Sequence, residues 1–302
     1  MNSDVVKEYI LNHTDFKLLN IECIGSGASG AVFKVNLEHE PYCVAVKCSK
    51  YPELLQKEYD QIKFISDRIE CKLPKLYSIG SDNNGSSFMV MEYFDGIGGD
   101  KIKNFFKASR VLSDQIVDNL LKIHSVHNDK FGPIDNAVYD TWYDYYSELA
   151  KEIYDFAVYS YENGKIRKKV MEAVELSYNR LDKILQDDTG IPTLIHGDYW
   201  QPNFVVNPKT YELVGVIDPF NIMWTEPEYE LFALATGAGA RLKLYENYKS
   251  RIIPSRYCDL KLEMYALYNE LLWHKKLGTY NNSYLLYRSK RLIRQMKRNK
   301  LI

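Results

Sequence analysis

The first third of the chain carries the short alternating pattern of β-strands. Apolar and β-branched residues alternate with polar ones at 31–35, 42–48 and 86–93, and the DNNG stretch at 82–85 is typical of a turn. Between the second and third runs, apolar positions of 52–65 recur at helical spacing after a proline suited to a helix start. This part of the chain is therefore predicted to be a small antiparallel sheet that carries one helix.

The hydrophobic period becomes helical from about residue 100. Only 193–217 returns to strand character, with a hairpin predicted around a turn at 207–210. We therefore expect an α+β fold of two lobes, with a small sheet in residues 1–94 and a larger, mostly α-helical lobe in residues 95–302. The predicted helices lie at about 113–127, 140–160, 166–186, 227–236, 241–252, 258–276 and 284–298.

The composition fits two lobes and indicates a location. A chain of 302 residues, 46% of them hydrophobic, buries two modest cores more naturally than one. No apolar stretch is long enough to cross a bilayer, and the first ten residues contain acids where a secretory signal needs a basic and then an apolar segment. We expect a cytoplasmic protein. The five cysteines show no CxxC spacing, so we expect reduced thiols and neither a disulfide framework nor a zinc site.

Charge is distributed unevenly although the net charge is −1. Residues 92–238 hold 24 acidic against 14 basic side chains, and residues 239–302 hold 15 basic against 4 acidic ones. The acidic middle is either an ordinary solvated surface or a wall that attracts a cationic small molecule. The basic end allows a nucleic-acid hypothesis, but its apolar positions fit one face of an ordinary terminal helix. We expect no nucleic-acid partner, no membrane partner, and a monomer or a dimer.

Residues 25–32 read GSGASGAV, which matches G-x-G-x-x-G-x-V at every fixed position and lies between expected strands. Glycine lets backbone N–H groups approach a phosphate where a side chain would intervene. A plain glycine-rich hairpin is the alternative. A dinucleotide-binding βαβ unit is disfavoured, because it would need a helix from Gly30 and the sequence there has a strand pattern.

A lysine follows on the next expected strand, in the stretch VAVK. Lys47 can point under the glycine segment toward phosphate groups. A lysine in that position needs a carboxylate to hold it. Glu58 on the following helix is the candidate, and Glu53 is the alternative.

The segment HGDYWQPN, residues 196–203, lies between two expected strands and places Asp198 five residues before Asn203. With a phosphate-binding segment and a lysine ahead of it, Asp198 can orient an attacking hydroxyl group and accept its proton. Asn203 and Asp218, the latter in VIDP after the next expected strand, can supply hard oxygen ligands to Mg²⁺. The predicted hairpin would bring Asp198 and Asp218 near each other.

In this order the motifs resemble the protein-kinase-like small-molecule kinases, a group that includes aminoglycoside phosphotransferases and fructosamine kinases. The resemblance spans nearly the whole chain, from GSGASGAV through VAVK and MEYFDG to HGDYWQPN, VIDP and EPEYELFAL. It implies a bilobal protein-kinase-like fold, ATP or GTP as phosphoryl donor, Mg²⁺ as cofactor and Asp198 as the catalytic base. His196 and the acids of EPEYEL would be structural supports. The implied nucleotide-binding residues are Gly25, Ser26, Gly27, Gly30, Val32, Ala45, Lys47, Glu58, Glu92, Tyr93 and Phe94, and the implied metal ligands are Asn203 and Asp218.

Departures from the protein-kinase pattern favour a small acceptor over a peptide. Gly197 stands where many protein kinases have an arginine, Pro219 and Phe220 follow the metal aspartate in place of Phe-Gly, and no A-P-E follows. An aminoglycoside is the simplest acceptor. A fructosamine kinase is the alternative, because DKFGPIDN, the HGD-x-W form and YNELLWHKKLG are similar to that family. A choline-type kinase and a catalytically silent nucleotide-binding module are less favoured.

The acidic middle favours an amine-bearing acceptor. Three acids spaced four apart lie on one face of a predicted helix, and tryptophans can serve as platforms for a sugar or a cation. Solvated acids and buried tryptophans are the alternative explanation. The candidate acceptor contacts are Asp140, Asp144, Glu148, Trp142, Trp200, Trp224 and Glu226.

Overall fold

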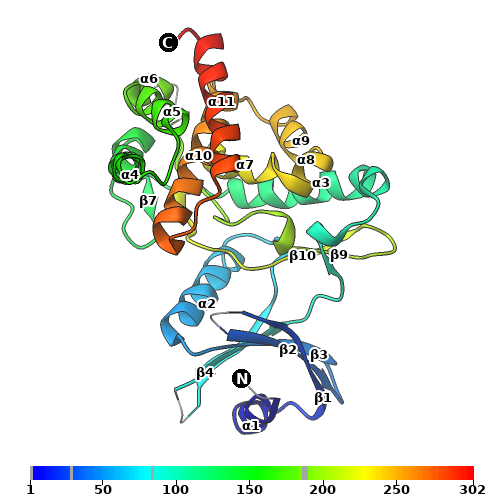
Figure 1. Ribbon diagram of the computed structural model, residues 1–302. Coiled ribbons are helices and arrows are strands. Elements are labelled where there is room, and N and C mark those ends of the chain that lie inside the picture. The colour runs from blue at the N-terminus through cyan, green and yellow to red at the C-terminus, as the bar shows by residue number, and fades with distance from the viewer. Residues whose placement is uncertain (1–2, 28–29, 83–84, 186–189) are drawn as a thin grey trace. The chain divides into compact units, whose positions relative to one another are not determined.

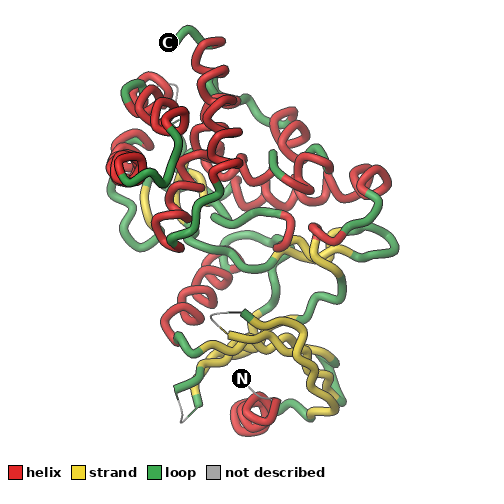
Figure 2. The backbone as a smooth tube through the Cα atoms, in the orientation of Figure 1, coloured by secondary structure: helices red, strands yellow, loops and turns green. Residues whose placement is uncertain are grey.

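The computed structural model describes residues 3–27, 30–82, 85–185 and 190–302. The chain forms two compact units. The first runs to Lys122 and includes Trp200–Asn221, and the second comprises Ile123–Tyr199 and Ile222–Ile302. An antiparallel sheet and many helices confirm the α+β class (Figures 1 and 2). The predicted division at residue 94 stays a prediction.

The first unit contains a five-stranded antiparallel sheet in the order β1-β2-β3-β5-β4. In the register of this sheet, Lys47 lies opposite Val32 on one side and Met89 on the other. The strands predicted at 31–35, 42–48 and 86–93 are confirmed, and β1 is the strand expected before the glycine segment, whereas β4 was not predicted. Residues 83 and 84 of the predicted DNNG turn lie outside the described residues. The strands are β1 (Leu18–Ser26), β2 (Gly30–Leu37), β3 (Cys43–Ser49), β4 (Leu76–Ser81) and β5 (Ser87–Glu92).

Two helices pack on this sheet, so the prediction of a single helix is wrong. The unpredicted helix α1 (Ser3–His13) packs against one face, where the Tyr9 ring stacks on Phe88 with centroids 4.3 Å apart. The predicted helix α2 (Pro52–Ser66) has its buried Leu55 and Ile62 in the apolar cluster of the other face. Lys47 belongs to that second face, because the β-strand alternation places it on the same side as Ala45.

The first unit also contains a second, three-stranded sheet in the order β10-β9-β6. The predicted hairpin is confirmed as the antiparallel pair of β9 and β10. Its turn is closed by Asn207, whose side-chain oxygen accepts from the N–H groups of Lys209 and Thr210. The elements are β6 (Ile97–Gly98), η1 (Gly99–Lys101), α3 (Phe105–His124, whose end belongs to the second unit), η2 (Gln201–Asn203), β9 (Phe204–Val206) and β10 (Leu213–Val216).

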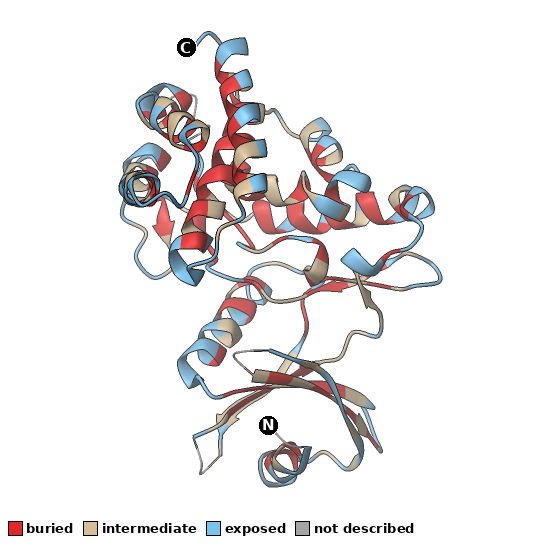
Figure 3. Ribbon diagram, in the orientation of Figure 1, coloured by how far each residue is buried: buried red, intermediate tan, exposed pale blue. Residues whose placement is uncertain are grey.

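The second unit is mostly helical, and its helices share an apolar core to which α10 contributes most of the buried side chains (Figure 3). A three-stranded sheet, β7-β11-β8, accompanies it. The elements are β7 (Gly132–Pro133), α4 (Trp142–Glu162), α5 (Lys168–Tyr178), α6 (Leu181–Leu185), β8 (Thr193–Leu194), β11 (Met223–Thr225), η3 (Pro227–Glu230), α7 (Leu231–Leu234), α8 (Gly237–Arg241), α9 (Leu244–Ser250), α10 (Cys258–Leu277) and α11 (Asn282–Arg298).

Three predicted helices are each broken into two elements. The predicted 166–186 helix is α5 and α6, 227–236 is η3 and α7, and 241–252 is the end of α8 followed by α9. Local backbone explains the last break, because Lys243 before α9 has φ of 58°, which a continuous helix does not allow.

The basic C-terminal helix α11 is the terminal core helix that its apolar pattern predicts. Leu285, Leu292 and Met296 are buried in the core of the second unit. Its buried Arg288 donates to Glu263 of α10 at 2.9 Å, and Arg291 donates to the other oxygen of the same carboxylate. In the described part of the chain, no helix combines the length and apolar character needed to cross a membrane. All five cysteines are free thiols.

Candidate functional site

Lys47 lies between two carboxylates of the first unit. Its Nζ is 2.7 Å from Glu58 Oε2 and 2.9 Å from Asp218 Oδ1. Glu58 is therefore the partner of Lys47, as predicted, and the alternative Glu53 is not needed. β3 carries the lysine, α2 the glutamate, and Asp218 follows β10, so three separate elements meet at one ammonium group. This ion triad joins the lysine that is predicted to bind phosphate to a candidate metal ligand.

Burial and charge act in opposite directions on this triad. Burial by itself would lower the pKa of Lys47, but the carboxylates of Asp218 and Glu58 raise it above its ordinary value. Burial raises the pKa of Glu58 to about 7, with Lys47 opposing the rise and Asp218 adding to it. Lys47 is thus fully charged at neutral pH, and the negative charge opposite it is shared between two carboxylates.

The three glycines of GSGASGAV have different surroundings. A Cβ atom at Gly30 would lie 1.8 Å from the backbone oxygen of Cys48, so only glycine fits where β2 meets β3. A Cβ at Gly25 or Gly27 would have nothing within 4 Å. Gly27 donates its N–H to the Gly30 oxygen at 2.8 Å, which closes the hairpin between β1 and β2. Residues 28 and 29 lie outside the described part of the chain.

Alanine substitutions should separate these two kinds of glycine. Gly30→Ala forces β2 away from β3 and is expected to lower the free energy of unfolding by about 1 to 3 kcal/mol or more. Gly27→Ala meets no atom and should leave stability nearly unchanged while weakening nucleotide binding. Thermal unfolding and nucleotide titration of both variants check this. Equal stability of the two would contradict it.

Phe94, an implied nucleotide-binding residue that follows β5, packs on β10. A Cβ atom at Gly215 of β10 would lie 2.0 Å from the Phe94 ring, so this glycine makes room for the aromatic side chain. Glu92 and Tyr93 line a cavity of about 270 Å³ together with residues of β2 and β3. The packing fixes the position of Phe94, and the nucleotide role of Glu92, Tyr93 and Phe94 stays a prediction.

Asn203 and Asp218, the predicted metal ligands, are neighbours through the backbone. The Asn203 carbonyl accepts from the N–H of Ile217 at 3.0 Å, directly before Asp218. Asn203 is buried at the end of η2. Asp218 has φ of 56°, in the left-handed region that is uncommon for non-glycine residues but that aspartate adopts more readily than most. The two oxygen-bearing side chains thus belong to one compact arrangement in the first unit.

Asp198 belongs to the second unit, in a loop fixed by a buried acid. Glu230 accepts from the N–H of Gly197 at 3.0 Å and from the N–H of His196 at 3.3 Å. Gly197 has φ of 80°, which explains a glycine immediately before Asp198. Asp218 belongs to the first unit, and the expected proximity of Asp198 to Asp218 stays a prediction.

Two further residues support this loop and carry no sequence motif. His124, at the end of α3, donates Nε2 to Glu230 at 2.7 Å, and its Nδ1 lies 2.6 Å from the Tyr248 hydroxyl. All three side chains are buried. The resemblance anticipated support from the EPEYEL acids, but His124 and Tyr248 are 106 and 18 residues from Glu230 in sequence, so no local spacing could identify them.

The candidate acceptor contacts on α4 have partners within the protein. Asp140 is bound by Lys130, Glu148 accepts from the Tyr139 hydroxyl at 2.9 Å, and Asp144 takes part in the cap of α4. All three acids stay accessible, because these pairs lie at the surface. Their predicted role in acceptor binding stays a prediction.

The tryptophans divide between surface and core. Trp142 and Trp224 are buried, with exposures of 0% and 6%, which corrects the prediction that they form platforms for a ligand. Trp142 is a core residue that donates its indole N–H to Tyr265 at 2.9 Å. Trp200, 43% exposed, stays a candidate.

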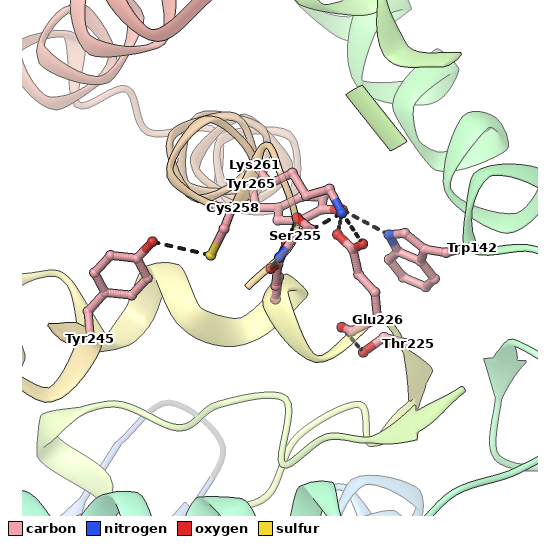
Figure 4. Close-up of polar contacts among 9 residues, drawn as sticks. Trp142, Thr225, Glu226, Tyr245, Ser255, Cys258, Lys261 and Tyr265 are labelled. Carbon is pink, nitrogen blue, oxygen red and sulfur yellow. Dashed lines mark hydrogen bonds and ion pairs between the residues drawn. The ribbon is translucent and has the colours of Figure 1, made fainter. Parts of the chain in front are cut away.

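Glu226 also needs correction as an acceptor contact, because it is only 2% exposed (Figure 4). It accepts from Lys261 at 2.5 Å and from the Tyr265 hydroxyl, and Lys261 is itself 3.4 Å from Glu228. Glu228 accepts from the backbone and hydroxyl of Ser255. The acids at 226, 228 and 230 thus tie η3 to three different parts of the second unit.

This cluster predicts a pH dependence of stability. Burial raises the pKa of Glu226 to about 7 from 4.5, and Glu228 adds to the rise, against Lys261 and Tyr265. A raised carboxyl pKa means that the folded state binds the proton more tightly, so this stabilisation is complete below pH 4.5 and is lost as pH rises through about 7.

Between pH 5 and pH 8 the wild-type free energy of unfolding should therefore fall by on the order of 1 to 3 kcal/mol more than that of Glu226→Gln. Urea unfolding at several pH values measures this difference. Parallel pH profiles for the two proteins would show that Glu226 is not the group that titrates.

The family model described as fructosamine kinase matches residues 3–298. The chain belongs to the fructosamine kinase family. This membership makes it a small-molecule kinase, and it supports the fructosamine-kinase alternative better than the aminoglycoside reading.

Three relatives illustrate the relationship. The kinase is 20% identical over 294 residues to the chloroplastic protein-ribulosamine 3-kinase of Oryza sativa subsp. japonica, covering 92% of this chain and 80% of the rice protein. A candidate fructosamine-3-kinase of Haemophilus somnus 129PT has a TM-score of 0.67 at 17% identity, covering 97% of this chain and 96% of that one. Aminoglycoside phosphotransferase APH(4)-Ia has a TM-score of 0.70 at 13% identity, covering 97% and 99%. These structures confirm the protein-kinase-like fold.

Proposed function

We propose that the kinase transfers the γ-phosphoryl group of ATP or GTP, with Mg²⁺, to a hydroxyl group of a ketosamine, a sugar joined to an amine. One observation carries the nucleotide part of this proposal. Lys47 Nζ lies within 3 Å of both Glu58 and Asp218, so a cation suited to phosphate and a carboxylate suited to a metal are held together. Nucleotide complexes of solved structures with this fold, containing ADP, AMP-PNP or GDP, support the same reading.

The donor set fits a magnesium ion. Asn203 offers a carboxamide oxygen and Asp218 a carboxylate oxygen. The backbone hydrogen bond from the Ile217 N–H to the Asn203 oxygen keeps Asn203 close to Ile217, the neighbour of Asp218 in the chain. In the described part of the chain no cluster of three or more His, Cys, Asp or Glu side chains could hold a metal. Mg²⁺ usually keeps waters and binds through one or two protein side chains plus phosphates, so this small donor set is the expected one. Bound there, the ion would neutralise charge on the phosphates.

The protein's own residues then have distinct tasks. The glycine segment and Lys47 orient the triphosphate. Asp198 orients the acceptor hydroxyl and accepts its proton as the hydroxyl oxygen bonds to the γ-phosphorus, while the bond from that phosphorus to the bridging oxygen breaks and the nucleoside diphosphate leaves. The charges balance, because the diphosphate takes the electron pair of the broken bond.

The acceptor assignment rests on family membership and on the rice relative, which is named for ribulosamine. An aminoglycoside is the second candidate, because solved neighbours of this fold contain hygromycin B. Both acceptors carry amines, which agrees with the acidic charge balance of residues 92–238.

A phosphoryl-transfer assay tests the proposal. The purified protein is incubated with labelled ATP or GTP and Mg²⁺, and with a fructosamine, a ribulosamine, hygromycin B or choline in parallel. Free fructose is the matched control for the fructosamine, because it lacks only the amine part. Transfer to a ketosamine well above transfer to free fructose is expected. Preference for hygromycin B would overturn the acceptor assignment, and absence of nucleotide binding would overturn the whole proposal.

A further inference from the structure

The residues that follow Asp218 are attached to α2 by a second lysine. Lys57 donates Nζ to the Asn221 side-chain oxygen at 2.7 Å, and the same ammonium lies 5.7 Å from the centre of the Phe220 ring. Lys57, Phe220 and Asn221 all belong to the first unit. We call residues 218–221 the metal segment, because the candidate metal ligand Asp218 begins it.

The backbone of the metal segment is in an uncommon conformation at both ends. Asp218 has φ of 56° and Asn221 has φ of 53°, so both ends of the segment are in the left-handed region. Aspartate and asparagine adopt this region more readily than other non-glycine residues, and contacts with neighbouring side chains help to hold them there. A lysine contacts each end, Lys47 at Asp218 and Lys57 at Asn221.

Both contacts lead to one turn of α2. Lys57 reaches Asn221 directly, and its neighbour Glu58 reaches Asp218 through Lys47, which it binds at 2.7 Å. Any movement of this turn would therefore act on both ends of the metal segment. We propose that Lys57 is a positioning residue that fixes the metal segment on α2 and thereby places the Asp218 carboxylate for its ligand. The metal readout of this inference rests on the proposed function.

The opposing explanation is that Lys57 is an ordinary surface lysine. Lys57 is exposed, and exposed charged pairs often contribute little. Lys63 provides the matched control, because it is also an exposed lysine of α2 but binds Asp67, immediately after the helix, at 2.7 Å. Lys57→Met and Lys63→Met remove the same charge from the same helix, and only the first removes a contact with the metal segment.

A second variant removes the contact from the other side. Asn221→Gly deletes the acceptor of Lys57, and glycine adopts positive φ without strain, so the backbone of the segment is preserved. If Lys57 acts through Asn221, the double variant should be no worse than the more affected single variant. Lys57→Arg keeps a charged donor for Asn221, so this variant should behave nearly like the wild type.

The first measurement needs no ligand and does not depend on the proposed function. Hydrogen exchange of the nucleotide-free protein should be faster in the metal segment of Lys57→Met and Asn221→Gly, by roughly 3- to 10-fold, the scale of one exposed charge-assisted hydrogen bond. Lys63→Met should match the wild type. Unchanged exchange in Lys57→Met would overturn the inference.

The second measurement is the Mg²⁺ dependence of phosphoryl transfer. The half-saturating Mg²⁺ concentration should rise roughly 3- to 10-fold in Lys57→Met and Asn221→Gly, with metal-free nucleotide affinity changed less than about 2-fold. Additive effects in the double variant, or an equal effect of Lys63→Met, would overturn the positioning role. If the wild type shows no Mg²⁺-dependent transfer, the proposed function fails, and the exchange experiment still decides whether Lys57 fixes the segment.

Discussion

Asp198→Asn is expected to lower the turnover number by a factor on the order of 10² to 10⁴, the usual range for a positioned general base. The asparagine keeps the size of the side chain but cannot accept the hydroxyl proton. Glu230 binds the backbone N–H groups of His196 and Gly197, not the Asp198 side chain, so the loop itself should persist in the variant. Nucleotide affinity should change little, because the nucleotide is expected to bind the Lys47 site.

Two separate measurements test this result. Single-turnover phosphorylation of the best acceptor reports the chemical step, and nucleotide titration reports binding. Asp155→Asn is the matched control, because it removes an exposed carboxylate that belongs neither to the loop nor to the candidate acceptor contacts. Full turnover in Asp198→Asn would mean that HGDYWQPN serves only structure, and a large loss of nucleotide affinity would mean that the loop and the Lys47 site are not independent.

Glu263→Ala is expected to lower the free energy of unfolding by about 3 to 5 kcal/mol, the cost of breaking a buried ion pair. Arg288 is 3% exposed and donates to Glu263 at 2.9 Å, so the variant leaves a buried guanidinium without its carboxylate. A guanidinium group stays protonated in proteins, so Arg288 cannot lose its charge to relieve this. The loss should therefore persist across the accessible pH range.

The control for this prediction is an exposed pair between α4 and α10. Glu152 and Lys275 are 2.8 Å apart with about half of each side chain exposed, so Glu152→Ala should cost less than about 1 kcal/mol. Urea unfolding of both variants gives the comparison. Replacing Glu263 and Arg288 together by apolar residues should recover part of the loss. Equal stabilities of Glu263→Ala and Glu152→Ala would contradict the argument.

The sequence predicted best where local pattern and chemistry coincide. Lys47 lies in an apolar, β-branched run typical of a strand, and Glu58 lies on a helix with clear apolar spacing, so their pairing could be expected. The contacts of His124, Tyr248 and Lys57 could not be predicted from the sequence, because each residue binds a partner far away in the chain. Trp142, Trp224 and Glu226 were misassigned for a related reason, since only the packed structure distinguishes a buried side chain from an exposed platform.

Elements with weak patterns were missed or had no predicted bounds. β1 was expected before the glycine segment but without bounds, and its residues are half-buried or exposed along LLNIECIGS, so no buried face marks where it begins. α1 is short and buries only Val6, Tyr9 and Ile10, which gives little periodic signal. In contrast, α4, α10 and α11 are long and were predicted within a few residues of their observed bounds.

The crowding at Gly30 has a consequence for how such chains are recognised. Within G-x-G-x-x-G, the neighbouring strand requires glycine only at the last position, and the fold leaves room for a side chain at the first two. Glycine at the first two positions is therefore expected to reflect nucleotide binding and not the fold. A relative that no longer binds a nucleotide could replace the glycines equivalent to Gly25 and Gly27 but would still need the glycine equivalent to Gly30. In this fold, a retained third glycine indicates only that the sheet is preserved. The first two glycines are the positions that indicate whether a chain still binds a nucleotide.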